Sequence, residues 1–293
     1  MRVALTGASG FIGAALARHA TEAGHEVTAL VRETSRRDHI ENWVDRFVVG
    51  SHENPDVMTG LLDGADAVIH NSFDWRVLKS GGLDAHLANN LSGSIALLRA
   101  SGDRQFIYMS SIAVHHHMHE KWSGSIDESH PTRPGTFYGA CKAAVEAHLW
   151  AVHAEKAQPF TAIRPCGVYG IDPNRERSIG WPIIEKLRRN EPFTRKGGGK
   201  FVHVEDVASC TVACLGNEKA SPRVYNLVDC YARWGDWAQM AAEMLGCDVP
   251  IDLTSPEEPV NSFEKEDVLA DLGVAMNRGH EGIRAHIAEM IAL

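Results

Sequence analysis

The sequence lacks any long apolar run. No stretch approaches the roughly 20 apolar residues that a helix needs to cross a bilayer, so we expect no membrane-spanning segment. The apolar residues after Arg2 belong to a predicted strand, and we therefore also expect no signal peptide. The six cysteines stand singly, without a Cys-x-x-Cys pair. This pattern favours reduced thiols in a cytoplasmic protein over a disulfide framework.

Positive charge is scarce as well. The 29 lysines and arginines are outnumbered by 38 acidic residues, which gives a formal net charge of −9. Nucleic-acid binding needs a basic face, so we expect no nucleic-acid partner. Hydrophobic residues make up 44% and charged residues 23% of the 293 positions. Both values are ordinary for a globular protein, and this length can bury a large core.

Three glycines spaced by two residues follow a short apolar strand at the start of the chain. Gly7 allows a tight turn, Gly10 allows backbone to approach a pyrophosphate, and Gly13 lets the next helix pack close to the strand. The helix N-terminus would then bind the phosphates. This strand–turn–helix context predicts a dinucleotide-binding loop, made of Gly7, Ser9, Gly10, Phe11, Ile12 and Gly13.

Short β-rich runs alternate with helical segments in the first half of the chain, which is typical of a doubly wound parallel α/β sheet, the Rossmann fold. We expect strands over 26–31, 46–49, 66–70, 105–110 and 160–164, and helices over 11–23, 82–100 and 136–156. The rhythm changes near residue 170, and later helices are expected over 178–190, 234–245 and 281–292. We therefore predict a dinucleotide-binding core over 1–170 and a small C-terminal substrate lobe over 171–293, with segments near 201–228 returning to the core.

Arg32 ends the predicted second strand, and Arg36 and Arg37 follow closely. In dinucleotide folds an acidic residue at this place binds the ribose 2′-hydroxyl, whereas an arginine accommodates a 2′-phosphate. A guanidinium can pair with a phosphate through two hydrogen bonds. Arg32 therefore predicts NADP in preference to NAD, and a solvated basic loop is the alternative interpretation.

Tyr138 and Lys142 are four residues apart near the start of a predicted long helix, so their side chains share one face. A nearby ammonium is expected to lower the tyrosine pKa and to make the phenol useful for proton exchange. Ser111, at the carboxyl end of the fifth strand, is the expected hydroxyl partner, because ligands bind at those strand ends in open α/β sheets. The alternative interpretation is that Tyr138 and Lys142 are two neighbouring side chains on the surface of a helix.

Taken together, these motifs resemble the extended short-chain dehydrogenase/reductases of the NAD-dependent epimerase/dehydratase family. Further matching segments run in the same order over residues 1 to about 230, namely 66–70, 90–94, 106–111, 163–170, 201–208 and 224–227. The resemblance implies that Ser111, Tyr138 and Lys142 are catalytic and that Lys142 also holds the nicotinamide ribose. It places other cofactor contacts at His70, Asn71 and Ser72 and in the turn of Pro165, Cys166, Gly167 and Val168. A homodimer through two long helices is common in similar proteins.

Three departures from the family pattern leave the substrate open. They are Gly50-Ser51 where Gly-Asp is common, Gly199-Lys200 in place of Arg-Asp, and Val114-His115-His116 in place of Val-Tyr-Gly. We expect substrate contacts from residues that follow the catalytic strands or replace the family's cation, namely Trp75, Arg76, His115 and Lys200. For Trp75 and Arg76, simple surface packing is the alternative.

Two segments invite misinterpretation. The histidines at 115–117 and 119 suggest a metal, but three consecutive side chains point in different directions and no helical carboxylate–histidine spacing accompanies them. We expect no metal site there, but a partly exposed loop above the active site. The basic segment 195–200 lacks the Gly-Lys-Ser/Thr ending of a P-loop, and we predict a hairpin before the Phe201 strand.

The resulting hypothesis is an NAD(P)-dependent oxidoreductase that acts on a small molecule: a sugar, a sugar acid or a related carbonyl compound. Two alternatives stay open. A nucleotide-sugar epimerase or dehydratase would use the same residues but retain its cofactor. A non-catalytic NADP-binding sensor would be expected to lose the tyrosine or the lysine, and both are present.

Overall fold

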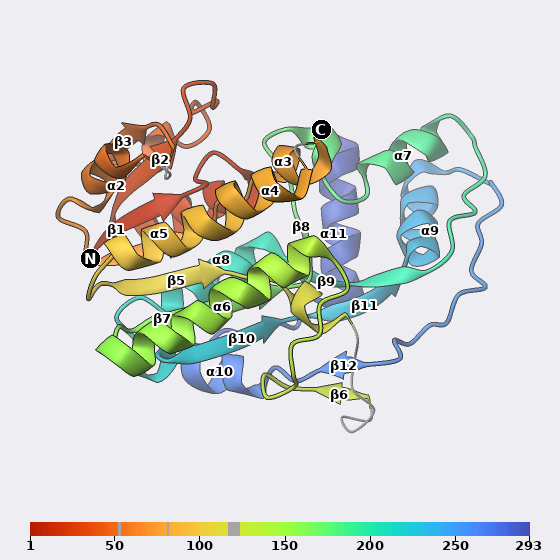
Figure 1. Ribbon diagram of the computed structural model, residues 1–293. Coiled ribbons are helices and arrows are strands. Elements are labelled where there is room, and N and C mark those ends of the chain that lie inside the picture. The colour runs from red at the N-terminus through yellow and green to blue at the C-terminus, as the bar shows by residue number, and fades with distance from the viewer. Residues whose placement is uncertain (52–53, 81, 117–123) are drawn as a thin grey trace.

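The computed structural model describes residues 1–51, 54–80, 82–116 and 124–293 (Figure 1). Its centre is a seven-stranded sheet in which every neighbouring pair is parallel. Across the sheet the order is β3 (Arg46–Val49), β2 (Glu26–Val31), β1 (Arg2–Thr6), β4 (Ala67–His70), β5 (Gln105–Met109), β7 (Phe160–Pro165) and β10 (Arg223–Leu227). The predicted doubly wound parallel sheet is therefore confirmed.

Helices cover both faces of this sheet, which explains why its central strands are apolar on both sides. One face packs against α1 (Phe11–Glu22), α8 (Val204–Ala213) and α10 (Glu266–Leu272). The other packs against α2 (Pro55–Leu62), α5 (Gly93–Ala100) and α6 (Phe137–Lys156), and α5 and α6 lie in front of the sheet in Figure 1.

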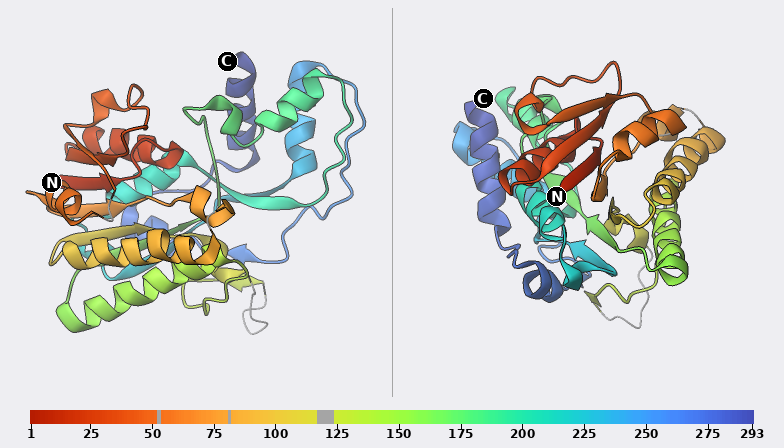
Figure 2. Two further views of the ribbon diagram at one scale, coloured as in Figure 1. Left: turned by 45° about the horizontal axis from the view of Figure 1, so that its top comes forward. Right: turned by 90° about the vertical axis from the view of Figure 1, so that its left-hand side faces the viewer.

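A smaller lobe has its own sheet and its own core. Its strands are β8 (Gly167–Tyr169), β9 (Gly198–His203) and β11 (Cys230–Arg233), and its helices are α7 (Trp181–Arg188), α9 (Trp234–Leu245) and α11 (Gly279–Ala292). Tyr169, Phe201 and Trp237 are buried at the centre of this lobe. The carboxyl ends of the strands of the large sheet point toward the lobe. The three helices of the lobe, α7, α9 and α11, lie together on the far side from β3 and α2 (Figures 1 and 2). A short parallel pair, β6 (Ser125–Ile126) and β12 (Ser262–Phe263), completes the sheets of the described residues.

The strand order reverses between β1 and β4. The chain leaves β1 toward β2 and β3, then returns to place β4 on the other side of β1. In open α/β sheets this reversal opens a crevice at the carboxyl ends of the two strands, where ligands bind. The loops that follow β1 and β4 therefore define where a site is expected.

Two predicted elements differ from the structure. The helix expected over 82–100 is interrupted: α4 (Gly82–His86) leads into a π-helical turn (Leu87–Ser92) before α5 begins, and α3 (Trp75–Ser80) precedes them. The hairpin expected over 195–200 is wrong, because β9 pairs in parallel with β8 and antiparallel with the distant β11. None of the helices in the described ranges has the length and apolar character needed to cross a membrane.

Candidate active site

The glycine-rich loop has the backbone that a phosphate cradle requires. Gly7 has a φ of +73°, a conformation that side chains disfavour. A Cβ at Gly13 would stand 1.9 Å from the carbonyl oxygen of Gly7, so only glycine lets α1 start this close to the loop. Gly10 caps α1 without a side-chain hydrogen bond, and no acidic residue lies in the first turn. The free amides at this helix end fit the phosphates of a dinucleotide.

The wall of the loop comes from the end of β4. The hydroxyl of Thr6 accepts the backbone N–H groups of Asn71 and Ser72, both at 3.1 Å, and lies 2.8 Å from Nδ1 of His70. With two bonds accepted, the Thr6 hydroxyl donates to Nδ1, so Nε2 of His70 carries the proton toward Ser94, at 2.8 Å. His70 is fully buried, so a cofactor contact through its side chain does not fit. It acts on the loop through Thr6.

Arg32 lies at the end of β2, as predicted, but it is paired. Its Nη2 lies 2.9 Å from Oδ2 of Asp74, and Arg76 contacts the same oxygen at 3.2 Å. Burial of Asp74 opposes its ionisation, but hydrogen bonds from Arg76 and the charge of Arg32 keep its pKa below the ordinary value. The Arg32 side chain is 53% exposed, and the three residues together carry one net positive charge.

The start of α6 is pressed against the segment that follows Ser111. Thr136 caps α6 by accepting the N–H of Gly139 at 3.1 Å. A Cβ at Gly139 would lie 2.4 Å from the carbonyl oxygen of Ala113, so glycine is needed for this close approach. The approach brings Tyr138 to Ser111, and the two hydroxyl groups interact by a hydrogen bond. The structure therefore brings together the predicted serine and tyrosine.

The electrostatics of this pair differ from the prediction. The pKa of Tyr138 is raised, chiefly by burial, and the hydrogen bond from Ser111 opposes the rise only in part. Lys142 does not supply the expected lowering: its Nζ lies 5.8 Å from the Tyr138 ring centroid and donates to the carbonyl of Met109 at 2.6 Å. Burial lowers the pKa of Lys142 to about 8, against the charges of Cys141 and Glu146. Below that pH the ammonium keeps its charge.

Aromatic rings surround Tyr138 on the side of the loop after β4. Trp75 stacks on the Tyr138 ring with centroids 4.6 Å apart, and Phe73 meets the same ring edge-on at 4.9 Å. The loop is held by Asn90, whose side chain accepts the N–H of Asp74 at 2.7 Å and donates to its carbonyl at 3.1 Å. Asn90 lies in the π-helical turn, a feature that often occurs at functional sites.

A buried ion pair lies next to Ser110 and one turn after Lys142 on α6. Glu146 of α6 pairs with Arg164 of β7, and the closest oxygen and nitrogen are 2.5 Å apart. The side chains are only 4% and 5% exposed. The hydroxyl of Ser110 donates to the same carboxylate, and Arg164 Nη1 also donates to Nε2 of His115 at 3.0 Å. This network joins α6, the end of β5 and β7, and thereby fixes the position of the Ser111 backbone.

His115 does not face a substrate opening. Its ring is fully buried between Arg164, His130 and Phe263. Burial and the charge of Arg164 lower its pKa to about 3, so the ring is neutral near pH 7. His117 and His119 lie outside the described residues. Within the described ranges no group of three or more His, Cys, Asp or Glu side chains is arranged to hold a metal ion.

The turn from Pro165 to Val168 leaves the large sheet and enters the lobe. Cys166 donates its N–H to Leu227 at 3.1 Å, and a Cβ at Gly167 would meet the carbonyl of Lys200 at 2.9 Å. Lys200 therefore lies against this turn. Its ammonium is 5.5 Å from the Phe263 ring centroid, and burial lowers its pKa.

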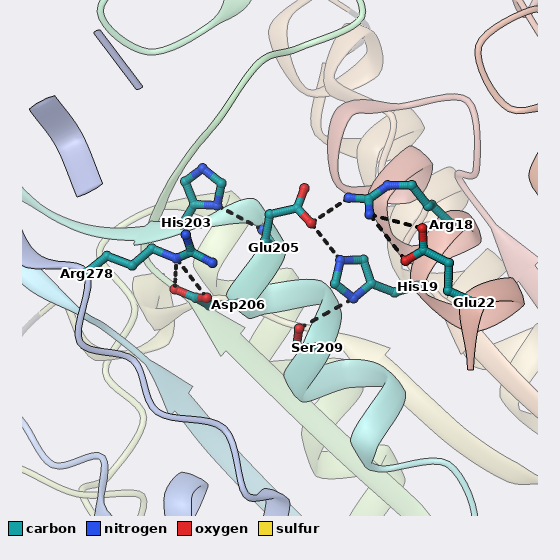
Figure 3. A network of polar contacts seen from close by, with 8 residues as sticks. All are labelled: Arg18, His19, Glu22, His203, Glu205, Asp206, Ser209 and Arg278. Atoms are coloured by element: carbon teal, nitrogen blue, oxygen red, sulfur yellow. Dashed lines mark hydrogen bonds and ion pairs between the residues drawn. The ribbon is translucent and has the colours of Figure 1, made fainter. Parts of the chain in front are cut away.

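A polar network ties the glycine-loop helix to the lobe (Figure 3). Glu205, in the first turn of α8, binds Arg18 at 2.5 Å and His19 at 2.7 Å, both on α1. The hydrogen bond from His19, together with Arg18, lowers the pKa of Glu205 to about 2 despite its burial. The next residue, Asp206, pairs with Arg278 at 2.8 Å, just before α11. Adjacent carboxylates on α8 thus connect α1 with the C-terminal segment.

This geometry defines a dinucleotide-binding α/β protein with a Ser–Tyr–Lys group at the carboxyl ends of its strands. Residues 3–227 match the family model described as NAD dependent epimerase/dehydratase family, and the chain belongs to that family. The resemblance predicted from the motifs is thereby confirmed.

Among curated relatives, a UDP-glucose 4-epimerase of Streptomyces lividans is 32% identical over 153 residues, which cover 48% of this chain and 44% of that one. A dihydroflavonol 4-reductase of Dianthus caryophyllus is 24% identical over 301 residues, covering 94% and 83%. This chain spans only 60% of the length of a curated relative described as a putative dihydroflavonol 4-reductase of Synechocystis, and only 44% of the Streptomyces epimerase. The solved UDP-glucose 4-epimerase of Thermotoga maritima superposes with a TM-score of 0.82 at 21% identity, over 100% of this chain and 99% of that one.

The sequence did not predict the roles of several supporting residues. These residues lie inside or beside the matched motifs, but a motif shows the order of residues and not which side chains are in contact. They are Thr6, Asn90, Glu146 and Glu205. Glu146 offers the one local signal, since it continues the four-residue spacing from Tyr138 through Lys142 along one face of α6.

Proposed function

We propose that the protein is an NADP-dependent oxidoreductase that interconverts a carbonyl group and an alcohol on a small molecule, a sugar, sugar acid or related compound. One observation carries this proposal: the Tyr138 hydroxyl, with a raised pKa, lies beside Ser111 at the carboxyl ends of the strands, next to a loop shaped for a dinucleotide. A phenol that stays protonated near neutral pH is suited to donate a proton to a carbonyl oxygen. This favours the direction of reduction.

Each residue has a defined task in this proposal. The Ser111 hydroxyl accepts the N–H of Ala113 at 3.2 Å, so it acts as a donor on its other side, and the proton that it now gives to Tyr138 passes to the substrate oxygen when substrate binds. Tyr138 donates a proton to that oxygen. Lys142, charged below about pH 8, holds the nicotinamide ribose in this proposal and not the phenol, because its Nζ lies 5.8 Å from the centroid of the Tyr138 ring. The bound nicotinamide supplies the hydride.

The preference for NADP rests on Arg32. The group of Arg32, Arg76 and Asp74 keeps one net positive charge, and half of the Arg32 side chain is exposed. A 2′-phosphate can therefore take Arg32 from Asp74 while Arg76 continues to neutralise that carboxylate. The glycine loop and the turn of Pro165 to Val168 hold the rest of the cofactor, with backbone of Asn71 and Ser72 forming the wall.

A nucleotide-sugar epimerase with a retained cofactor is the second candidate. The relatives named as UDP-glucose 4-epimerases favour it. Purified protein that holds its cofactor through dialysis and converts a UDP-sugar without net change in nicotinamide absorbance would support this candidate. A sensor without turnover is disfavoured by the intact Ser111, Tyr138 and Lys142. We further propose a cytoplasmic homodimer, which cell fractionation and analytical ultracentrifugation test.

Cofactor titration and a single substitution test the main proposal. Wild-type protein should bind NADPH more tightly than NADH by nucleotide fluorescence, and Arg32→Asp should reverse that order. Tyr138→Phe should retain cofactor binding but lose roughly 10²–10⁴-fold in turnover. Tighter binding of NADH by the wild type would refute the cofactor assignment, and full turnover by Tyr138→Phe would refute the role of the tyrosine.

A further inference from the structure

An apolar surface borders Tyr138 on its outer side. Four large side chains on this surface remain substantially exposed: Phe137 at 62%, Trp75 at 48%, Leu83 at 46% and Leu87 at 38%. Phe137 precedes the tyrosine, and its carbonyl accepts a hydrogen bond from the His86 ring at 3.3 Å. His86 ends α4, and Leu87 begins the π-helical turn that packs against α6, while Leu83 lies one turn before His86 on α4.

Trp75 is the residue of this surface that touches the candidate catalytic group. Its indole is nearly parallel to the Tyr138 ring, at 27°, and packs against Phe73 with centroids 4.8 Å apart. Asn90 fixes the preceding residue, Asp74, through both its N–H and its carbonyl. Half of a large, rigidly held indole thus stays exposed beside the proton-donating hydroxyl. Such a flat aromatic face binds another ring well because the area is large and little side-chain entropy is lost.

We propose that Trp75 is a specificity residue, and that the substrate is a ketone carrying an aromatic or other apolar ring next to its carbonyl. This inference rests on the proposed reduction at Tyr138, and among the carbonyl compounds proposed there it favours an apolar ketone over a sugar. With the carbonyl oxygen held by Ser111 and Tyr138, the substituent on the carbonyl carbon extends along the exposed half of the indole, and Phe137 and the two leucines border it. A sugar ring would bring several hydroxyl groups that each need a partner when buried, and these apolar side chains offer none.

Two probes that differ in one ring test the proposal. The substrates are 1-phenyl-1,2-propanedione and 2,3-butanedione, and NADPH oxidation is followed by absorbance. Trp75→Ala should lower the ratio of kcat/KM for the phenyl compound to kcat/KM for butanedione roughly tenfold, in line with the energy of an aromatic pair. Trp75→Phe should retain most of the preference. The matched control is Trp150→Ala. Trp150 is 46% exposed, like Trp75, and packs edge-on against Phe160. It lies about 18 Å from Tyr138 along α6, so its loss should not change the preference between the two diketones.

A binding measurement separates this inference from the proposed function. Saturation-transfer NMR with Tyr138→Phe protein and NADPH should show contact with the phenyl protons, and the signal should disappear when Trp75→Ala is added. If the wild type reduces neither diketone, reduction of ketones of this class is refuted, while loss of the signal in Trp75→Ala would still support the ring site. Absence of phenyl contact in Tyr138→Phe, equal losses for both diketones, or UDP-glucose conversion that Trp75→Ala leaves unchanged would each overturn the inference.

Discussion

Removing one partner of the Glu146–Arg164 pair should destabilise the protein strongly. In Arg164→Met the Glu146 carboxylate stays 4% exposed but loses all three of its close contacts from the guanidinium, and keeps only the Ser110 hydroxyl. An ionised carboxylate stranded in this interior costs about 3–5 kcal/mol of unfolding free energy. With an m value of about 3 kcal/mol/M, the urea midpoint should fall by about 1–1.7 M.

Urea unfolding followed by the fluorescence of the seven tryptophans measures this shift. The double variant Glu146→Leu/Arg164→Met removes both charges, so it should lose much less stability than the sum of the single variants. The control is Arg2→Met, which breaks a pair with Asp66 whose side chains are 57% and 40% exposed, and its midpoint should barely move. A loss below about 1 kcal/mol in Arg164→Met, or additive losses in the double variant, would refute the reasoning.

Three further predictions follow from single contacts. Gly139→Ala places a methyl group 2.4 Å from the carbonyl of Ala113 and should lower kcat by pushing Tyr138 from Ser111, while fluorescence titration shows NADPH affinity nearly unchanged. The pKa of His286 is lowered to about 4 by burial, so the folded state binds fewer protons than the unfolded state between pH 6.5 and 4, and stability falls as pH falls through that window. His286→Gln should therefore reduce the slope of unfolding free energy against pH by about 1.4 kcal/mol per unit, and an unchanged slope would contradict this. Asn90→Ala frees the loop after β4 and should raise KM more than it lowers kcat in steady-state assays, whereas an unchanged KM would show that the clamp is not needed.

Sequence reasoning predicted the sheet well because its signals are local. The apolar strands, the glycine spacing and the four-residue interval in α6 each show in a short window, and the β2 and β3 bounds agree with the structure. Partners that meet through the fold could not be predicted this way. Asp74 is 42 residues from Arg32, so nothing near Arg32 indicates that its charge is already paired. His115 follows β5 closely, but its burial depends on Arg164 and Phe263, far along the chain.

The electrostatic error at Tyr138 has the same origin. The spacing to Lys142 is correct, yet the lysine turns to the carbonyl of Met109 and to the ring of Tyr108, whose centroid is 4.6 Å from Nζ. Burial of the phenol then decides its pKa. A helix spacing specifies which face two side chains share, but the groups that compete for the ammonium come from β5.

The strand order has a consequence for how the chain acquires its binding site. The backbone wall of the glycine loop arrives 65 and 66 residues after Thr6, and the turn of Pro165 to Val168 forms only once β10 pairs with β7, when Cys166 donates its N–H to Leu227. Contacts of such sequence separation form late in folding, because closing long loops is entropically costly. A nascent chain that ends before residue 223 therefore lacks a complete dinucleotide site. The cofactor therefore binds only the fully folded chain. At a concentration of 100 times its Kd it would add about 2.7 kcal/mol to the free energy of unfolding.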